Sequence, residues 1–301
     1  MTKNHCGAVH PDDTLSMRIV SKQWHLAHGR ALELGPTARI MGVLNVTPDS
    51  FSDGGRFDRL DDAVAQAERM IEEGADIVDI GGETTKPGAV SVSASEEQAR
   101  VLQVIKALAA RTPALISIDT YRAETARLAV EAGAHIVNDV WGLQREPHIA
   151  EVAAATGAGL VVMHTGRERV VDPDVIADQK AFLGKSLEIA ASAGVPPQRI
   201  VLDPGFGFAK ETMEINLDLM ARFEELHALG FPLLVGTSRK RFIGGLTGRA
   251  PDDRDVATAA TSAILRLKGA AIFRVHNVAF SRDALVFADA MLARQGHQQD
   301  R

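Results

Sequence analysis

The sequence predicts one α/β domain built as a (β/α)8 barrel, the TIM-barrel architecture, with an N-terminal β-hairpin. Three observations lead to this prediction. From residue 38 onward, short apolar runs alternate with amphipathic segments eight times without a long break. Glycine follows several of the amphipathic segments, and glycine is the residue that most often ends a helix. Polar residues follow each apolar run, at the edge where barrels of this class carry their active sites.

The chain divides into a leader, a hairpin and eight strand–helix units. Residues 1–16 are polar, and we expect a flexible leader. Residues 17–35 alternate loosely between apolar and polar side chains around His28-Gly29-Arg30, which predicts a hairpin that plugs one end of the barrel. The hairpin and barrel together form a single domain over residues 17–301.

The apolar runs predict the strands, and the segments between them predict the helices. We expect strands at 40–46, 76–80, 115–118, 135–140, 159–163, 200–202, 233–235 and 271–275. We expect helices at 60–73, 95–110, 122–132, 147–155, 175–193, 214–229, 254–268 and 279–292. A doubly wound open sheet is the alternative, and eight units of near-equal length count against it.

Composition excludes several classes of protein. A hydrophobic content of 46% against 24% charged residues indicates a sizeable core. A net charge of -6 predicts no general attraction to nucleic acid or to membrane surfaces. The single cysteine, Cys6, excludes a disulfide framework and a thiolate metal site. With no secretory signal pattern and no apolar run near the roughly 20 residues of a membrane span, we expect a cytoplasmic protein.

Polar residues at the carboxyl ends of the predicted strands define a candidate site. Because these ends meet at one face of a barrel, their side chains should converge on one mouth. Buried polar groups are costly to desolvate, so a purely structural barrel would not need so many of them. They are Asn45, residues 81–88, Asp119, Thr120, Asn138, Asp139, His164, residues 203–207, residues 238–241, Arg274, His276 and Asn277.

Three of these residues, Asp119, Asn138 and Asp203, suit a flat, nitrogen-rich heterocycle. A carboxylate can accept two parallel hydrogen bonds from an amino group and a ring N–H, and an amide can both donate and accept. A helix N-cap is the plainer alternative for Asp119. That alternative is weaker for Asp203, since the Pro-Gly-Phe-Gly that follows predicts a tight turn and not a helix start.

Basic side chains at the same face oppose the net charge of the protein, as an anionic ligand such as a phosphate requires. They are Lys86, Arg239, Lys240, Arg241, Arg274 and His276. Solvated surface positions are the alternative for Arg239 and Arg241, whereas Arg274 directly follows an apolar pair at a strand end. Asn45 with a neighbouring carboxylate offers oxygen ligands for Mg2+. No P-loop, dinucleotide fingerprint or Ser-His-Asp spacing is present.

Seven stretches of this polar face share one order along the chain. They are NVTPDSFSDGG from Asn45, DIGGETTKPG from Asp79, SIDT from Ser117, Asn138-Asp139, LDPGFGF from Leu202, SRK from Ser238 and RVH from Arg274. Together they closely resemble the motifs of the dihydropteroate synthase family of pterin-binding barrels. The resemblance runs from about residue 39 to residue 291, essentially the whole predicted barrel.

This resemblance implies a transferase of folate biosynthesis, the target of sulfonamides. Such enzymes condense 6-hydroxymethyl-7,8-dihydropterin diphosphate with 4-aminobenzoate by a dissociative route, in which diphosphate leaves before the arylamine attacks. Family dimers form through the late helices, so we expect a homodimer. The resemblance also supports the Mg2+ ion as the cofactor, and it leaves no role for nucleic acid or membranes.

Residue by residue, the resemblance assigns four groups of positions. The pterin-binding positions are Asp119, Asn138, Asp203 and Lys240, and the catalytic positions are Lys240, Asp119, Arg274 and His276. The diphosphate-binding positions are Arg274, His276 and Lys86, and the magnesium ligand is Asn45. The 4-aminobenzoate-binding positions are Phe51, Thr85, Pro87, Phe208 and Arg241.

The chain departs from the family pattern in the second loop and after the SRK stretch. Lys86 stands where arginine is common, Thr84 replaces a usual serine, and Arg241 stands where many members have serine. Two other functions remain as alternatives: a corrinoid- or folate-linked methyltransferase domain, and a non-catalytic pterin-binding paralogue. The stretches 45–55 and 274–276 argue against the first, and the presence of every ligand position argues against the second.

Overall fold

The computed structural model describes residues 21–47, 56–83 and 92–299. Its strands form a hairpin and a barrel whose neighbouring strands are all parallel, in the order β8-β7-β6-β5-β4-β3-β10-β9. A parallel bridge between Leu202 and Leu233 joins the two end strands, so the sheet closes. The strands are β1 (Lys22–His25), β2 (Ala31–Leu34), β3 (Arg39–Asn45), β4 (Ile77–Gly81), β5 (Leu115–Asp119), β6 (Ile136–Asp139), β7 (Gly159–Met163), β8 (Ile200–Asp203), β9 (Leu234–Val235) and β10 (Ile272–Val275).

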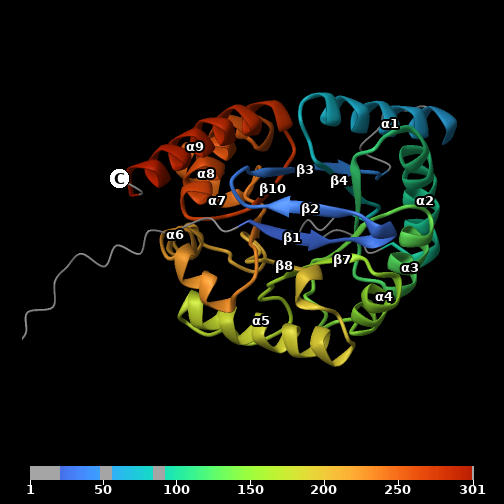
Figure 1. Ribbon diagram of the computed structural model, residues 1–301, viewed down its shortest axis with the longest axis horizontal. Helices are drawn as coiled ribbons and strands as arrows, with labels where there is room; N and C mark the ends of the chain where they lie inside the picture. Colours follow the sequence, from blue (N-terminus) through green and yellow to red (C-terminus); the bar gives the residue numbers. More distant parts are fainter. Residues whose placement is uncertain (1–20, 48–55, 84–91, 300–301) are drawn as a thin grey trace, which may run out of the picture.

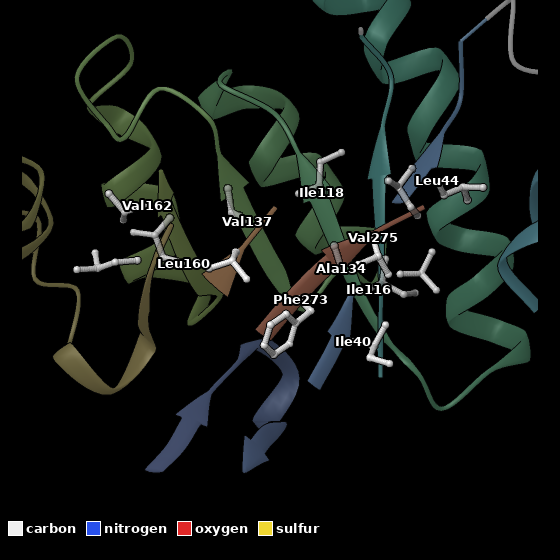
Figure 2. Close-up of a cluster of buried hydrophobic side chains, with 14 of the residues drawn as sticks. Ile40, Leu44, Ile116, Ile118, Ala134, Val137, Leu160, Val162, Phe273 and Val275 are labelled. Atoms are coloured by element: carbon white, nitrogen blue, oxygen red, sulfur yellow. The ribbon is translucent and has the colours of Figure 1, made fainter. Parts of the chain in front are cut away.

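Helices surround the strands on the outside of the barrel (Figure 1). They are α1 (Arg56–Glu72), α2 (Ala94–Arg111), α3 (Ala123–Glu131), α4 (His148–Thr156), α5 (Val175–Ser192), α6 (Met213–Ala221), α7 (Arg241–Thr247), α8 (Asp255–Leu267) and α9 (Val278–Gln299). Apolar side chains of the barrel strands, among them Ile40, Leu44 and Phe273, form one buried cluster (Figure 2), which also includes side chains of these helices. The predicted (β/α)8 barrel is therefore confirmed.

Local sequence explains where several helices begin and end. Ser93 caps α2, because its side chain accepts a hydrogen bond from the backbone of Glu96 while the Glu96 carboxylate accepts one from the backbone of Ser93. Asp174 caps α5 by accepting from the backbone of Ile176 and of Ala177. Gly157 follows α4 with a φ of 72°, the left-handed conformation that ends a helix.

The predicted hairpin is present from β1 to β2, which pair in antiparallel fashion. Trp24 and Leu26 of this hairpin are buried and pack with Met41, Ile77 and other apolar side chains at one end of the barrel interior. The Trp24 indole donates to the carbonyl oxygen of Arg199 over 2.8 Å. The hairpin thus closes this end, and the opposite end is left for the functional site.

The inward-facing side chains of the strands form layers, because side chains along a strand alternate between its two faces. In β4, Ile77 belongs to the apolar layer beside the hairpin, and Asp79 lies one layer higher. The same two-residue step leads from Ile136 to Asn138 and from Val201 to the next inward residue, Asp203. The layer above the apolar plug is therefore polar.

Two helix predictions need correction. The segment predicted as one helix at 214–229 divides into α6 and a 3-10 helix, Phe223–Leu229. The short helix α7 was not predicted, because Gly244-Gly245 in its middle is typical of a loop. A Cβ atom on Gly244 would lie 2.2 Å from the guanidinium of Arg254, so Gly244 leaves the space that this side chain occupies. Among the described residues, no helix is long and apolar enough to cross a membrane.

Candidate active site

An arginine bridging two aspartates lies at the centre of the polar layer. Arg274 of β10 donates from Nε to Oδ2 of Asp79 over 2.6 Å and from Nη2 to Oδ2 of Asp119 over 2.7 Å. Burial disfavours the charge of Arg274, but the two carboxylates outweigh it and raise its pKa. Burial raises the pKa of Asp119 and Arg274 lowers it, with burial the larger influence. The contact with Arg274 makes Asp119 one side of an ion pair. The N-cap of α3 is Arg122, without a side-chain hydrogen bond, so the N-cap alternative for Asp119 is wrong.

Asn138 is held by Asp79, one of the two aspartates that Arg274 contacts. Its Nδ2 donates to Oδ2 of Asp79 over 3.1 Å, and its side chain is 2% exposed. That hydrogen bond fixes the orientation of the amide, so the Asn138 oxygen remains as an acceptor for a ligand. The other oxygen of Asp79, Oδ1, is buried and has no hydrogen-bond partner in the described structure. A buried carboxylate oxygen without a donor marks a place where a ligand or water would be stabilised.

Asp203 ends β8 at the mouth of the barrel and is 4% exposed. Its Oδ1 accepts a hydrogen bond from the backbone N–H of Gly205 over 2.7 Å. Burial raises the pKa of Asp203 to about 6, although Gly205, Lys240 and Arg274 act in the opposite direction. Oδ2 lies 4.0 Å from the position that a Cβ of Gly236 would take, so this glycine leaves space beside the carboxylate.

Aromatic rings and cations alternate along one side of the mouth. The Lys240 ammonium lies 4.0 Å from the Phe208 ring centre, and the Arg167 guanidinium lies 4.8 Å from the same centre. Arg167 and Arg145 also lie 5.6 and 4.4 Å from the Trp141 ring centre. Burial lowers the pKa of Lys240 to about 8, and Arg274 adds to that effect. The side chain is therefore still mostly protonated at pH 7 and available to an anionic or electron-rich ligand.

The surroundings of His276 disfavour the positive charge that the sequence predicted. Burial, with Arg274, Arg239 and Lys240 nearby, lowers its pKa to about 3. The Ser238 hydroxyl accepts from the backbone N–H of His276 over 3.1 Å and lies 2.9 Å from its Nδ1. The tautomer in which the Ser238 hydroxyl donates to Nδ1 carries the ring proton on Nε2. His276 can serve an anion as a neutral hydrogen-bond donor.

Two further cations of the predicted cluster, Arg239 and Arg241, have different surroundings. Arg239 is neither a solvated side chain nor part of the mouth: it donates to both oxygens of Asp255 over 2.8 and 2.9 Å and to Asp252 over 3.1 Å. It thereby fastens the loop after β9 to α8. Arg241 begins α7 and is exposed, so its predicted contact with a substrate carboxylate stays a prediction.

Asn45 is suitably placed for a magnesium ion. It ends β3, is exposed, and pairs in register with Gly81, which itself pairs with Asp119. A Cβ atom on Gly81 would lie 3.7 Å from Oδ1 of Asn45 and 3.9 Å from Oδ2 of Asp119, so both oxygens border the space over this glycine. Amide and carboxylate oxygens suit Mg2+, which keeps several waters. Within the described residues no group of three or more His, Cys, Asp or Glu side chains forms a fuller metal site.

Comparisons with known proteins agree with this geometry. Residues 41–276 match the family described as pterin binding enzyme. The dihydropteroate synthase of Bacillus subtilis (strain 168) is 46% identical over 266 residues, covering 88% of this chain and 93% of that protein. The chain belongs to the dihydropteroate synthase family. It is accordingly a transferase that functions in folate biosynthesis.

Solved dihydropteroate synthases share the fold along nearly their full length. The Xanthomonas albilineans enzyme with 4-aminobenzoic acid is 42% identical with a TM-score of 0.85, covering 90% of this chain and 99% of that one. The Clostridium difficile enzyme solved in the presence of pteroic acid is 44% identical with a TM-score of 0.83, covering 86% and 98%. A Yersinia pestis enzyme in complex with a sulfonamide drug is 40% identical with a TM-score of 0.82, covering 90% and 99%.

Sequence reasoning predicted most polar members of this dihydropteroate synthase site but missed Asp79. Its signal was present, because an aspartate within an apolar strand is buried only when it has partners. The apolar wall was missed as well: Val140 and Met163 are buried together with Phe208, and Trp141 packs against them. Four predicted positions, Phe51, Thr85, Lys86 and Pro87, lie outside the described residues.

Proposed function

We propose that this transferase condenses 6-hydroxymethyl-7,8-dihydropterin diphosphate with 4-aminobenzoate, giving 7,8-dihydropteroate and diphosphate. The observation that carries the proposal is the buried polar layer above the apolar layer beside the hairpin. Asn138, Asp203 and Arg274 all belong to this polar layer. Relatives with the same fold are solved with pteroic acid and with 4-aminobenzoic acid. The methyltransferase alternative shares the pterin pocket, but it does not need an anion-binding arginine beside that pocket.

The pterin ring would be held by its nitrogen-rich edge. Asp203 accepts from the amino group and a ring N–H, and the Asn138 oxygen accepts from a further N–H. The apolar wall of Val140, Met163 and Phe208 offers its faces to the flat ring. Asp203 must be ionised to accept both hydrogen bonds, and Lys240 and Arg274 favour that state.

Departure of diphosphate would be promoted by positive charge and by hydrogen-bond donors. The bond between the pterin methylene carbon and the diphosphate oxygen breaks, and the arylamine nitrogen then attacks this carbon and releases one proton. Arg274 and His276 supply a cation and a neutral N–H donor for the leaving oxygens. Asn45 would hold Mg2+, which supplies further charge for the leaving group when bound. The site holds no obvious nucleophile or strong base, so positioning and charge must provide the catalysis.

The arylamine would bind beside Phe208, with Lys240 and Arg241 on the same side of the mouth. Phe51, Thr85 and Pro87 remain predicted 4-aminobenzoate positions, and Lys86 a predicted diphosphate position. Because a related enzyme is solved with a sulfonamide drug, we expect sulfonamides to compete with 4-aminobenzoate here. We place the enzyme in the cytoplasm on the basis of its sequence.

A homodimer through α8 and α9 is part of the same proposal. These two helices pack together and carry a group of exposed apolar side chains: Val256, Ile264, Phe280, Val286, Phe287 and Met291. Phe287 is 77% exposed, which is costly in water unless a partner covers it. A second copy presents the same face, so one patch can bury the other.

Product analysis tests the proposed reaction. The enzyme is mixed with pterin diphosphate, 4-aminobenzoate and Mg2+, and chromatography follows dihydropteroate and diphosphate. We expect equal amounts of both products, and no dihydropteroate when 4-aminobenzoate is omitted. A protein that transfers a methyl group from methyltetrahydrofolate to a corrinoid, and forms no dihydropteroate, would show that the methyltransferase alternative is right.

A further inference from the structure

Lys210 is a buried lysine for which the proposed reaction has no use. Its side chain is 5% exposed, and its Nζ lies 2.9 Å from Nδ1 of His164 and 2.9 Å from the carbonyl oxygen of Gly205. The carbonyl oxygen of Phe208 lies 3.5 Å away. Burial lowers the pKa of Lys210 to about 7. None of these partners is a carboxylate, so the charge is buried without the direct ion pair that usually offsets its desolvation.

A hydrogen-bonded chain behind Lys210 keeps it in place. Burial lowers the pKa of His164 to about 4, so the imidazole is neutral near pH 7. Nδ1 faces the Lys210 ammonium, and Nε2 lies 2.8 Å from Oδ2 of Asp178 and 2.9 Å from Nη2 of Arg169. The acceptor oxygen of Asp178 favours the tautomer with the ring proton on Nε2. Arg169 donates to both oxygens of Asp178, over 2.8 and 2.6 Å. The loop after β7 and helix α5 therefore fix the position of the ammonium group.

In front of Lys210 lies the turn that carries two proposed substrate contacts. Gly205 is held at both ends: its N–H donates to Asp203, and its carbonyl accepts from Lys210 and, over 3.1 Å, from the backbone N–H of Phe208. Its φ is +63°, and a Cβ atom would lie 2.1 Å from the carbonyl oxygen of His164. Only glycine therefore fits at this position, and Lys210 stabilises the turn through the Gly205 carbonyl.

We propose that Lys210 is a positioning residue for pterin recognition. By holding the carbonyl groups of Gly205 and Phe208, it sets the turn that directs the Asp203 carboxylate and the Phe208 ring toward the substrate. This inference rests on the proposed function, because it takes both groups as substrate contacts. Lys210 also acts through charge: together with Lys240 and Arg274 it favours the ionised form of Asp203.

The charge effect provides a readout that a purely structural residue would not change. We compare Lys210→Met, which keeps most of the side-chain volume, with Lys185→Met, which removes an exposed lysine from α5. For both variants and the wild type, calorimetry measures the affinity for pterin diphosphate from pH 5 to pH 8. Lys210→Met should bind about tenfold more weakly, since the buried hydrogen bonds of Nζ to the carbonyl oxygens of Gly205 and Phe208 are lost. The pH below which its binding falls should move upward, because Asp203 becomes harder to ionise.

The outcomes separate this inference from the proposed function. If the wild type does not bind pterin diphosphate, the proposed function is wrong. If the wild type binds and Lys210→Met matches Lys185→Met in both affinity and pH profile, only the role of Lys210 is wrong. Should Lys210→Met fail to fold, Lys210→Gln, which keeps a donor for Gly205 without the charge, should bind with the same upward pH shift. Failure of both variants to fold would also overturn the proposal, since Lys210 would then serve the fold alone.

Discussion

Arg274 donates a hydrogen bond to Asp119 over 2.7 Å. The sequence resemblance assigned Arg274 to diphosphate binding and Asp119 to pterin binding. Because Arg274 also bonds to Asp79, and Asp79 to Asn138, the positions proposed for both halves of the substrate belong to one continuous hydrogen-bonded group. A diphosphate that draws Arg274 toward itself changes the charge around the ring pocket. Under the proposed function, we therefore expect binding of the pterin and of the diphosphate to be coupled.

Removal of Arg274 should affect more than diphosphate. In Arg274→Ala we expect a loss of stability of roughly 3 kcal/mol, because Asp79 is left as an unpaired buried carboxylate. Affinity for pterin diphosphate should fall further than affinity for the bare hydroxymethylpterin, since only the former loses a phosphate contact. Chemical denaturation and calorimetry measure the two effects.

A double variant provides the control for this prediction. Asp79→Asn in the Arg274→Ala background removes the unpaired charge, so it should restore part of the lost stability. If the second substitution instead adds its own full cost, Arg274 and Asp79 are not coupled and the central ion pair is wrong.

Asp203→Asn should weaken pterin binding at least roughly tenfold, since one acceptor becomes a donor facing a donor, at a cost of about 1–3 kcal/mol. The wild-type affinity should decrease below pH about 6, the pKa to which burial raises Asp203. The variant should lack this decrease. Calorimetry across this pH range measures it, and an unchanged acid-side decrease in the variant would contradict the assignment.

Asp203→Asn should weaken pterin binding but stabilise the ligand-free protein. Burial raises the pKa of Asp203 from 3.8 to about 6, so the folded state holds the proton more tightly than the unfolded state. Stability from this group is present below pH 4 and is lost as the pH rises to about 6. Without ligand at pH 7, Asp203→Asn should therefore melt at a higher temperature than the wild type.

His276 should remain neutral throughout the physiological range. Its lowered pKa, about 3, predicts no protonation between pH 8 and pH 5. An NMR titration of the imidazole resonances, assigned with His276→Gln, measures this directly. A midpoint near 6.5 would restore the cationic role that the sequence suggested.

The proposed dimer depends on the exposed apolar face of α8 and α9. Phe287→Asp places a charge at the most exposed aromatic position of this face and should give monomers in sedimentation experiments at micromolar concentration. Val170→Asp is the matched control, because Val170 is 94% exposed in the loop after β7. A wild-type protein that is already monomeric contradicts the dimer.

The fold could be predicted because strand and helix periodicity are properties of local sequence. Met41 and Ile77 are apolar and pack in the barrel interior, as the alternation along their strands predicts. Gly157 ends α4 because glycine readily adopts the left-handed conformation. Site positions at strand ends, such as Asp203, followed from the same pattern. The pairing of Arg274 with Asp119 could not be predicted from the local pattern, because the two residues lie on different strands, 155 positions apart.

The charge states and partners of some site residues could not be predicted from the sequence for a related reason. His276 is neutral because of how it is buried and what surrounds it, and neither is a local property. Arg239 looked like a mouth residue beside Lys240, but its side chain turns to Asp255 at the start of α8. Its φ of +58° shows that the backbone changes direction there, which no residue type in the stretch indicates.

A crystal structure with bound pterin tests the central claim most directly, because it measures which side chains meet the ring. We predict the amino group and a ring N–H within hydrogen-bond distance of the Asp203 carboxylate, the Asn138 oxygen on the same edge, and the ring against Met163 and Phe208. A pterin bound outside the polar layer, with Asp203 still bonded to Gly205 alone, would contradict the account.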